Sequence, residues 1–300
     1  MYDVNSKGIS YTAGFFMLIA FTIAGILLAS LISIPVWTNM TGLSFKNMEK
    51  GMSNPANSDA AKVLQVITAI VGFFLPAVVT ASLLNRKPLK LLGFSRGIKI
   101  NQTGLVLFIM VASLFVSASF SYFTDIIPIP ESWRTLFDKW ENNYNEMAAA
   151  IISLNNTFEF ILALIIMAFL PALCEETLFR GGLQNFLTRS TKVPWLSILI
   201  VSLIFSAVHF SYYGFLSRVF LGAILGIIYQ LSGKLWLSII GHFINNALAI
   251  TVLYIYKTQG KSLDDAIAET NDSYWGILAL PVVIGLLLVF KRTSFNQKTQ

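Results

Sequence analysis

The chain has 300 residues, of which 55% are hydrophobic and only 12% are charged. A soluble domain of this length carries about a quarter charged residues, so the composition excludes an ordinary soluble protein and indicates a polytopic membrane protein. The net charge of +6 comes from basic residues that lie between apolar runs rather than on one patch, and we therefore expect no nucleic-acid partner.

Eight apolar segments reach the length of about 17–25 residues that a transmembrane helix needs. In chain order they are 12–37, 63–85, 103–123, 158–174, 193–211, 214–231, 235–256 and 274–290. The first is far longer than the apolar core of a signal peptide, so we expect it to be retained as a span. The sequence thus predicts an all-α membrane helix bundle of about eight transmembrane helices, in a multi-pass protein of the plasma membrane.

The order of these segments predicts one membrane domain, 1–300, with no internal repeat and no separate soluble part. Residues 1–157 hold the first three spans and a long loop, 158–256 hold the polar motifs described below, and 257–300 hold a loop and the last span. The long loop, about 124–157, mixes prolines, tryptophans and acids, which favours an amphipathic helix at the membrane surface.

Basic residues are unevenly distributed between the two sets of loops. If the N-terminus is cytoplasmic, the segments on that side hold thirteen of the twenty-one Lys and Arg residues. These segments are 1–11, 86–102, 175–192, 232–234 and 291–300. Because cytoplasmic loops of membrane proteins are enriched in Lys and Arg, we expect both termini to be cytoplasmic.

Two adjacent acids and an arginine follow the apolar run of the fourth span. At a helix centre one such charge costs about 2.5–3.5 kcal/mol, so it usually faces the protein interior and serves a function. Glu176 and Arg180 are i,i+4 neighbours, a spacing typical of an ion pair. Glu175 points about 100° away on the helix and is left as a candidate general base. The alternative is a charge cluster at the membrane interface.

The only two histidines of the chain, His209 and His242, also lie within apolar segments. His242 and Asn246 share one helix face at i,i+4. Each of these side chains alone is more often a structural group that binds helix to helix. Their placement on three segments together, with none in a loop, favours one common site.

A hairpin argument places two of these groups at the same depth. The fourth and fifth spans are antiparallel, with a turn near 190–194. Glu175 and His209 each lie about 22–27 Å from that turn at 1.5 Å per residue. We expect them to meet if the fourth helix continues through Arg180 to Leu187, although Gly181 and Gly182 could kink it.

Three motifs carry a resemblance to a known family. They are Glu175-Glu176-x-x-x-Arg180, Phe205-x-x-x-His209 and His242-x-x-x-Asn246, in this order on separate apolar segments. The set resembles the signature of the CPBP intramembrane proteases, which include the CAAX prenyl endopeptidases and the bacteriocin-processing or Abi proteins. The resemblance covers about residues 158–250.

The resemblance implies an endopeptidase that hydrolyses a peptide bond in or near the bilayer. It implies that Glu175 and His209 activate a water, and that His242 and Asn246 stabilise the oxyanion. Glu176 and Arg180 would then orient Glu175. The implied partner is a peptide or membrane-protein substrate, and the sequence leaves open whether that substrate carries a prenyl group.

Other interpretations stay open. Glu175, His209 and His242 are enough ligands for a catalytic zinc, but their spacing differs from H-E-x-x-H, so we favour a site with no metal or other cofactor. A proton- or ion-coupled transporter is a second class, although no inverted repeat supports it. A non-catalytic immunity or scaffold protein is a third. Cys174, the single cysteine, excludes an intrachain disulfide and is expected to pack between helices.

Overall fold

The computed structural model describes residues 4–95, 97–152, 154–261 and 274–295. In these ranges the chain is helical and forms no sheet, apart from one isolated bridge between Ser6 and Asn85. Within these described ranges, seven helices are long and apolar enough to cross a membrane. They are Tyr11–Thr41, Pro55–Leu84, Ile100–Asp125, Thr157–Thr191, Phe215–Ser232, Leu235–Thr258 and Tyr274–Phe295. The predicted all-α, multi-pass membrane bundle is confirmed.

The fifth predicted span, 193–211, is shorter in the structure. It corresponds to α11 (Pro194–Ala207), a helix of 14 residues. At 1.5 Å per residue this helix is about 21 Å long, less than the ~30 Å of a hydrocarbon core. The chain then turns through residues 208–214 and returns as α12 (Phe215–Ser232). Because α11 is shorter than the hydrocarbon core, the turn that carries His209 does not reach the membrane surface at which a full transmembrane helix would end.

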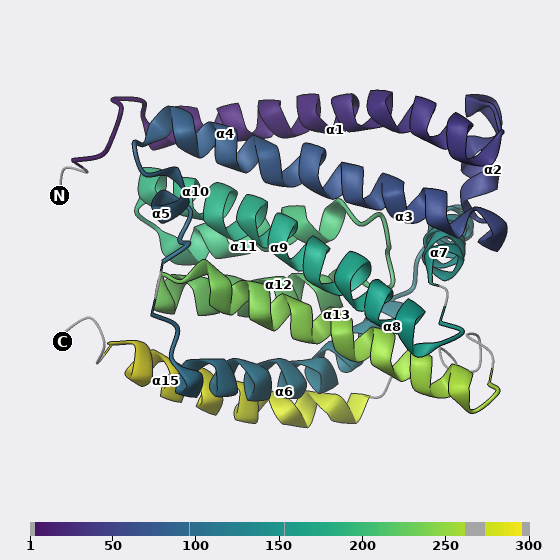
Figure 1. The fold of residues 1–300 in the computed structure, drawn as a ribbon. Helices are drawn as coiled ribbons and strands as arrows, with labels where there is room; N and C mark the ends of the chain where they lie inside the picture. Colours follow the sequence, from purple (N-terminus) through teal and green to yellow (C-terminus); the bar gives the residue numbers. More distant parts are fainter. Residues whose placement is uncertain (1–3, 96, 153, 262–273, 296–300) are drawn as a thin grey trace.

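The first two long helical spans form one side of the bundle (Figure 1). It begins with α1 (Tyr11–Thr41), followed by the short α2 (Met48–Met52). One continuous span is then built from α3 (Ser58–Ile67), η3 (Thr68–Phe74) and α4 (Leu75–Leu84). The short α5 (Pro88–Leu91) leads to α6 (Ile100–Asp125) on the opposite side of the bundle.

The long central helix runs from Thr157 to Thr191. It consists of α8 (Thr157–Ala163), η4 (Leu164–Phe169), α9 (Leu170–Glu176), η5 (Thr177–Gln184) and α10 (Asn185–Thr191). The predicted continuation through Arg180 to Leu187 is confirmed. Both η4 and η5 are π-helical, a widening that recurs at functional sites. Pro171 follows η4 closely, and its missing N–H removes one i→i−4 bond there.

Gly181 and Gly182 bring neighbouring segments close to the central helix. A Cβ at Gly181 would lie 2.9 Å from the carbonyl oxygen of Leu92, and one at Gly182 would lie 2.4 Å from a methyl group of Leu18. Only a residue without a side chain permits these approaches. The glycine pair therefore serves helix packing, and the helix continues through it.

Apolar clusters hold the central helix between the two sides of the bundle. One cluster joins α1, α4, η5 and α11, through residues such as Leu18, Ala77, Phe179 and Val201. A second joins α6, α12, α13 (Leu235–Thr258) and α15 (Leu280–Phe295), which follows η6 (Tyr274–Ala279). In Figure 1, α1 begins and α15 ends at the same end of the bundle.

The loop between the third and fourth spans contains α7 (Glu131–Ile151), as its composition predicts. Figure 1 shows this helix end-on, so it crosses the ends of the other helices instead of running alongside them. Aromatic rings join it to the turn after α11, with Phe137 stacked on Tyr212 at 4.3 Å between ring centroids. This arrangement matches a helix lying along a membrane surface.

Candidate active site

Glu176 and Arg180 form a fully buried ion pair in the central helix. The Nη1 of Arg180 donates to Oε1 of Glu176 at 2.8 Å, and the two side chains are 1% and 0% exposed. Nη2 of Arg180 donates to the carbonyl of Gly222 at 3.0 Å, and the guanidinium carbon lies 4.8 Å from the ring centre of Phe205. The predicted i,i+4 pair is therefore present, and Arg180 also links the central helix to α12.

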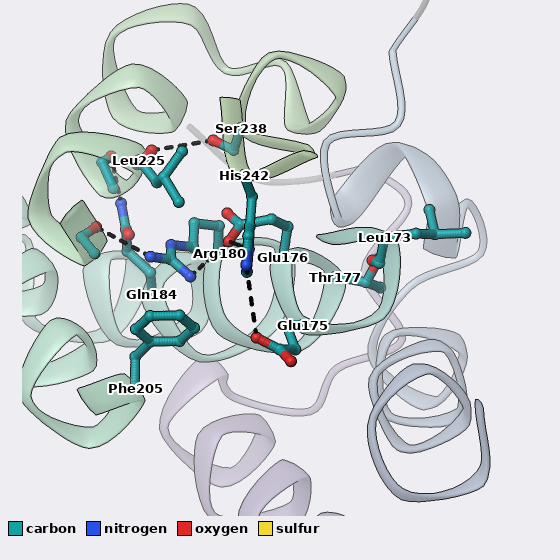
Figure 2. Close-up of polar contacts among 12 residues, drawn as sticks. Leu173, Glu175, Glu176, Thr177, Arg180, Gln184, Phe205, Leu225, Ser238 and His242 are labelled. Atoms are coloured by element: carbon teal, nitrogen blue, oxygen red, sulfur yellow. Dashed lines mark hydrogen bonds and ion pairs between the residues drawn. The ribbon is translucent and has the colours of Figure 1, made fainter. Parts of the chain in front are cut away.

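Glu175 is turned away from this pair, as its position on the helix predicts. Its Oε2 is buried and accepts no hydrogen bond from the described residues. The nearest charged partner is Nε2 of His242, 3.9 Å away, beyond hydrogen-bonding distance (Figure 2). A buried carboxylate oxygen with no donor is unusual in a folded protein and points to a functional role for Glu175.

His242 reaches the same place from α13. Its Nδ1 donates to Oε1 of Glu176 at 2.9 Å, so Glu176 binds both Arg180 and His242. Glu176 thus contacts His242 directly, and its expected role in orienting Glu175 stays a prediction. Because Nδ1 is engaged, only Nε2 of His242 is free, and it faces Glu175 (Figure 2).

His209 lies just after the end of α11, next to Phe205. Its Nδ1 donates to the carbonyl of Phe205 at 2.7 Å, which assigns the hydrogen to Nδ1 and leaves Nε2 as an acceptor in the neutral ring. The Phe205 ring stands edge-on between the two histidines, 4.9 Å from the centre of His209 and 5.9 Å from that of His242. Phe210, the next residue, has a φ of 49°, which turns the chain sharply after His209.

One cavity of about 520 Å³ brings these groups together. Glu175, His209, His242 and Asn246 all line it, so the hairpin argument holds for the pair Glu175 and His209. Glu176 and Arg180 lie behind the cavity wall. Within the described residues, no cluster of three His, Cys, Asp or Glu side chains is arranged to hold a metal ion.

The comparison with family models assigns this part of the chain. Residues 157–248 match the model described as type II CAAX prenyl endopeptidase, Rce1-like. These residues belong to the CAAX protease family. The match includes all six predicted site residues and excludes α1 to α7 and α15. No curated protein and no solved structure matches the chain.

Two further residues line the cavity, and the sequence did not single them out as functional. Asn245 lines the cavity beside Asn246, and its amide donates to Oδ1 of Asn246 at 3.1 Å. Arg218 also lines the cavity. Its position within an apolar run was the available signal.

Proposed function

We propose that the chain is a metal-free intramembrane endopeptidase, in which Glu175 and His209 activate a water and His242 and Asn246 stabilise the oxyanion. The observation that carries the proposal is that four residues lining one cavity each have a polar group with no hydrogen-bond partner among the described residues. These groups are Oε2 of Glu175, Nε2 of His209, Nε2 of His242 and the N–H groups of Asn246.

Water activation needs a base within reach of the nucleophile. Ionised Glu175 has a free oxygen, and the Nδ1–H of His209 is fixed by Phe205, so its Nε2 can accept a hydrogen bond from the same water. A positioned base contributes about 10²–10⁴-fold in rate. One group takes the proton while the other orients the water toward the peptide carbonyl.

Oxyanion stabilisation needs donors on the opposite side of the carbonyl. Asn246 accepts from Asn245 through its oxygen, so its own N–H groups remain available. His242 donates through Nε2 only when it carries both protons, because its Nδ1–H already binds Glu176. The charge is balanced when His242 and Arg180 are positive and the two glutamates are negative.

The reaction then follows from these positions. Water transfers a proton to Glu175 and its oxygen bonds to the carbonyl carbon, giving a tetrahedral intermediate whose negative oxygen binds His242 and Asn246. The C–N bond breaks as the leaving nitrogen takes a proton from Glu175. The products are a free amine and a carboxylic acid, which loses its remaining water-derived proton to solvent, and Glu175 is restored in its ionised form.

The family description and the cavity lining both indicate the substrate class. The matched model is described as a type II CAAX prenyl endopeptidase. The cavity wall includes apolar side chains from several helices, such as Met110, Met167 and Leu253, which fit aliphatic residues of a peptide. We therefore propose a membrane-anchored peptide substrate, cleaved at the plasma membrane, with the prenyl group as a specificity element.

Glu175→Gln tests the proposal because it keeps the side chain's shape and removes its basicity. Purified protein in detergent is assayed on a farnesylated peptide that ends in Cys-Val-Ile-Met, and we expect the rate to fall by about 10³-fold or more. Glu159→Gln is the matched control, since Glu159 binds Asn155 and Asn156 outside the cavity. Comparison of membrane peptides from wild-type and Glu175→Gln cells then identifies natural substrates. Unchanged processing by Glu175→Gln would exclude the mechanism, whereas no processing by the wild type would favour a scaffold.

Chelation tests the absence of a metal. We expect activity to persist after exhaustive treatment with a chelator. Loss of activity that zinc restores would contradict the proposal and would favour the alternative in which Glu175, His209 and His242 bind zinc.

A further inference from the structure

One cation of the cavity has no role in the proposed reaction. Arg218 lies in the first turns of α12 and is half-buried. Its guanidinium has a 3.5 Å contact with the carbonyl of Ser211 and lies 5.3 Å from the ring centre of Tyr144 on α7. Among the described residues it forms no ion pair with a carboxylate. Since a guanidinium has five N–H donors, most of them are unoccupied.

This placement is costly unless a ligand compensates for it. A cation within an apolar bundle loses hydration, and the N-terminal end of a helix carries a partial positive charge that repels it. Arg180, the other arginine at the cavity wall, is fully paired with Glu176 and a carbonyl oxygen. Among the described residues, the only hydrogen bond of the Arg218 guanidinium is the 3.5 Å contact with the Ser211 carbonyl, and Arg218 lines the cavity.

Because Gly214 has no side chain, the guanidinium of Arg218 lies close against the backbone there. A Cβ at this position would lie 2.4 Å from Nη1 of Arg218 and 2.6 Å from its guanidinium carbon. The φ of Gly214 is −85°, which an alanine can adopt. Gly214→Ala would therefore displace the Arg218 head group while keeping its charge in the protein.

We propose that Arg218 binds a carboxylate of the peptide substrate, at the end of an apolar stretch that occupies the cavity. This inference rests on the proposed peptidase function. Arg218 can form two parallel hydrogen bonds with a carboxylate, and Met147, Leu221 and Leu225 line the same cavity for aliphatic side chains. The carboxylate is either the free C-terminus of the substrate or an acidic side chain near it.

Binding of short peptides tests the proposal without requiring catalysis. The probes are N-acetyl-Val-Ile-Met with a free C-terminus, the same peptide as a C-terminal amide, and N-acetyl-Val-Ile-Glu amide. Equilibrium binding is measured on the purified full chain in detergent. We expect the free acid to bind about tenfold more tightly than the amide, which is the scale of one charge-assisted contact. Equal binding of the Glu amide would assign the subsite to side-chain acids as well as to the C-terminus.

Variants assign the effect to Arg218. Arg218→Gln and Gly214→Ala should bring the affinities for acid and amide to within about twofold, whereas Arg218→Lys should keep part of the preference. Arg134→Gln is the matched control on α7, outside the cavity lining. Size-exclusion and thermal unfolding show that each variant is folded.

Three results would overturn the proposal. These are equal binding of acid and amide by the wild type, no binding of any probe, or an acid preference that persists in Arg218→Gln. Failure of the peptidase function itself would appear separately, as an inactive wild type that still prefers the acid.

Discussion

Asn246 and Asn245 are adjacent amides with different partners, which gives them different expected roles. Asn246 keeps its N–H groups free, whereas Asn245 donates to Oδ1 of Asn246. Asn246→Ala should lower kcat by about 10²–10³-fold with little change in KM, as for loss of an oxyanion donor. Asn245→Ala is the matched control and should have a smaller effect, since it removes only the group that orients Asn246. Equal losses in both variants, measured on the farnesylated peptide, would contradict the assignment.

The ion pair of Glu176 and Arg180 makes a separate prediction about stability. Arg180→Ala leaves Glu176 buried without its cation, so the free energy of unfolding should fall by about 3–5 kcal/mol. The double variant Glu176→Gln/Arg180→Met removes both charges and should recover much of that stability. Unfolding in detergent measures both. A double variant as unstable as Arg180→Ala would show that packing, not the unpaired charge, is responsible.

At this scale the sequence predicted the contacts within one helix and missed those between helices. The spacing of Glu176 and Arg180 was sufficient for the ion pair, because i,i+4 neighbours are close on any α-helix. The bond from His242 to Glu176 depends on how α13 is rotated against the central helix. That rotation follows from packing around Leu235 and Ile239, which a pattern of apolar residues does not fix.

At the level of elements, α7 and the turn after α11 form one unit beside the cavity. Ser211 donates to Glu141 at 2.7 Å and Tyr213 to Asp138 at 2.5 Å, while Phe137 stacks on Tyr212. The surface helix therefore holds the turn that carries His209. The predicted span 193–211 was too long because the sequence stays apolar through Val208 and Phe210. The break comes instead from the positive φ of Phe210, which no glycine or proline signals.

The hydrogen bond between Tyr213 and Asp138 should make the free energy of unfolding depend on pH. The hydrogen bond to Asp138, with smaller effects of burial, raises the pKa of Tyr213 to about 12. Because the ordinary pKa is about 10, the stabilisation is fully present below about pH 10 and is lost as the pH rises through about 12. Wild type and Tyr213→Phe should therefore differ in unfolding free energy by a constant amount in the neutral range and converge above pH 10. A difference that shrinks between about pH 6 and 8 would contradict this account.

For the whole molecule, the sequence predicted the number and order of spans more closely than their packing. Alternating apolar runs and loops located all seven long helices and the shorter α11. The central helix packs between the two sides of the bundle because neighbouring segments approach it closely at residues such as Gly181 and Gly182. Such contacts are seen in the three-dimensional structure and not in the sequence. The orientation in the membrane remains a prediction from the distribution of Lys and Arg.

Cysteine labelling can test that orientation, because Cys174 is the only cysteine and is buried. In a Cys174→Ala background, single cysteines replace Lys99, which precedes α6, and Lys50 in α2. The start of α6 and α2 lie at opposite ends of the bundle (Figure 1). If the loops rich in Lys and Arg are cytoplasmic, a membrane-impermeant maleimide added to intact cells should label the Lys50→Cys variant. It should label the Lys99→Cys variant only after the cells are opened. The opposite labelling pattern would show that the protein has the reverse orientation in the membrane. It would also place α7 and the turn that carries His209 on the cytoplasmic side, so that substrates would enter from there.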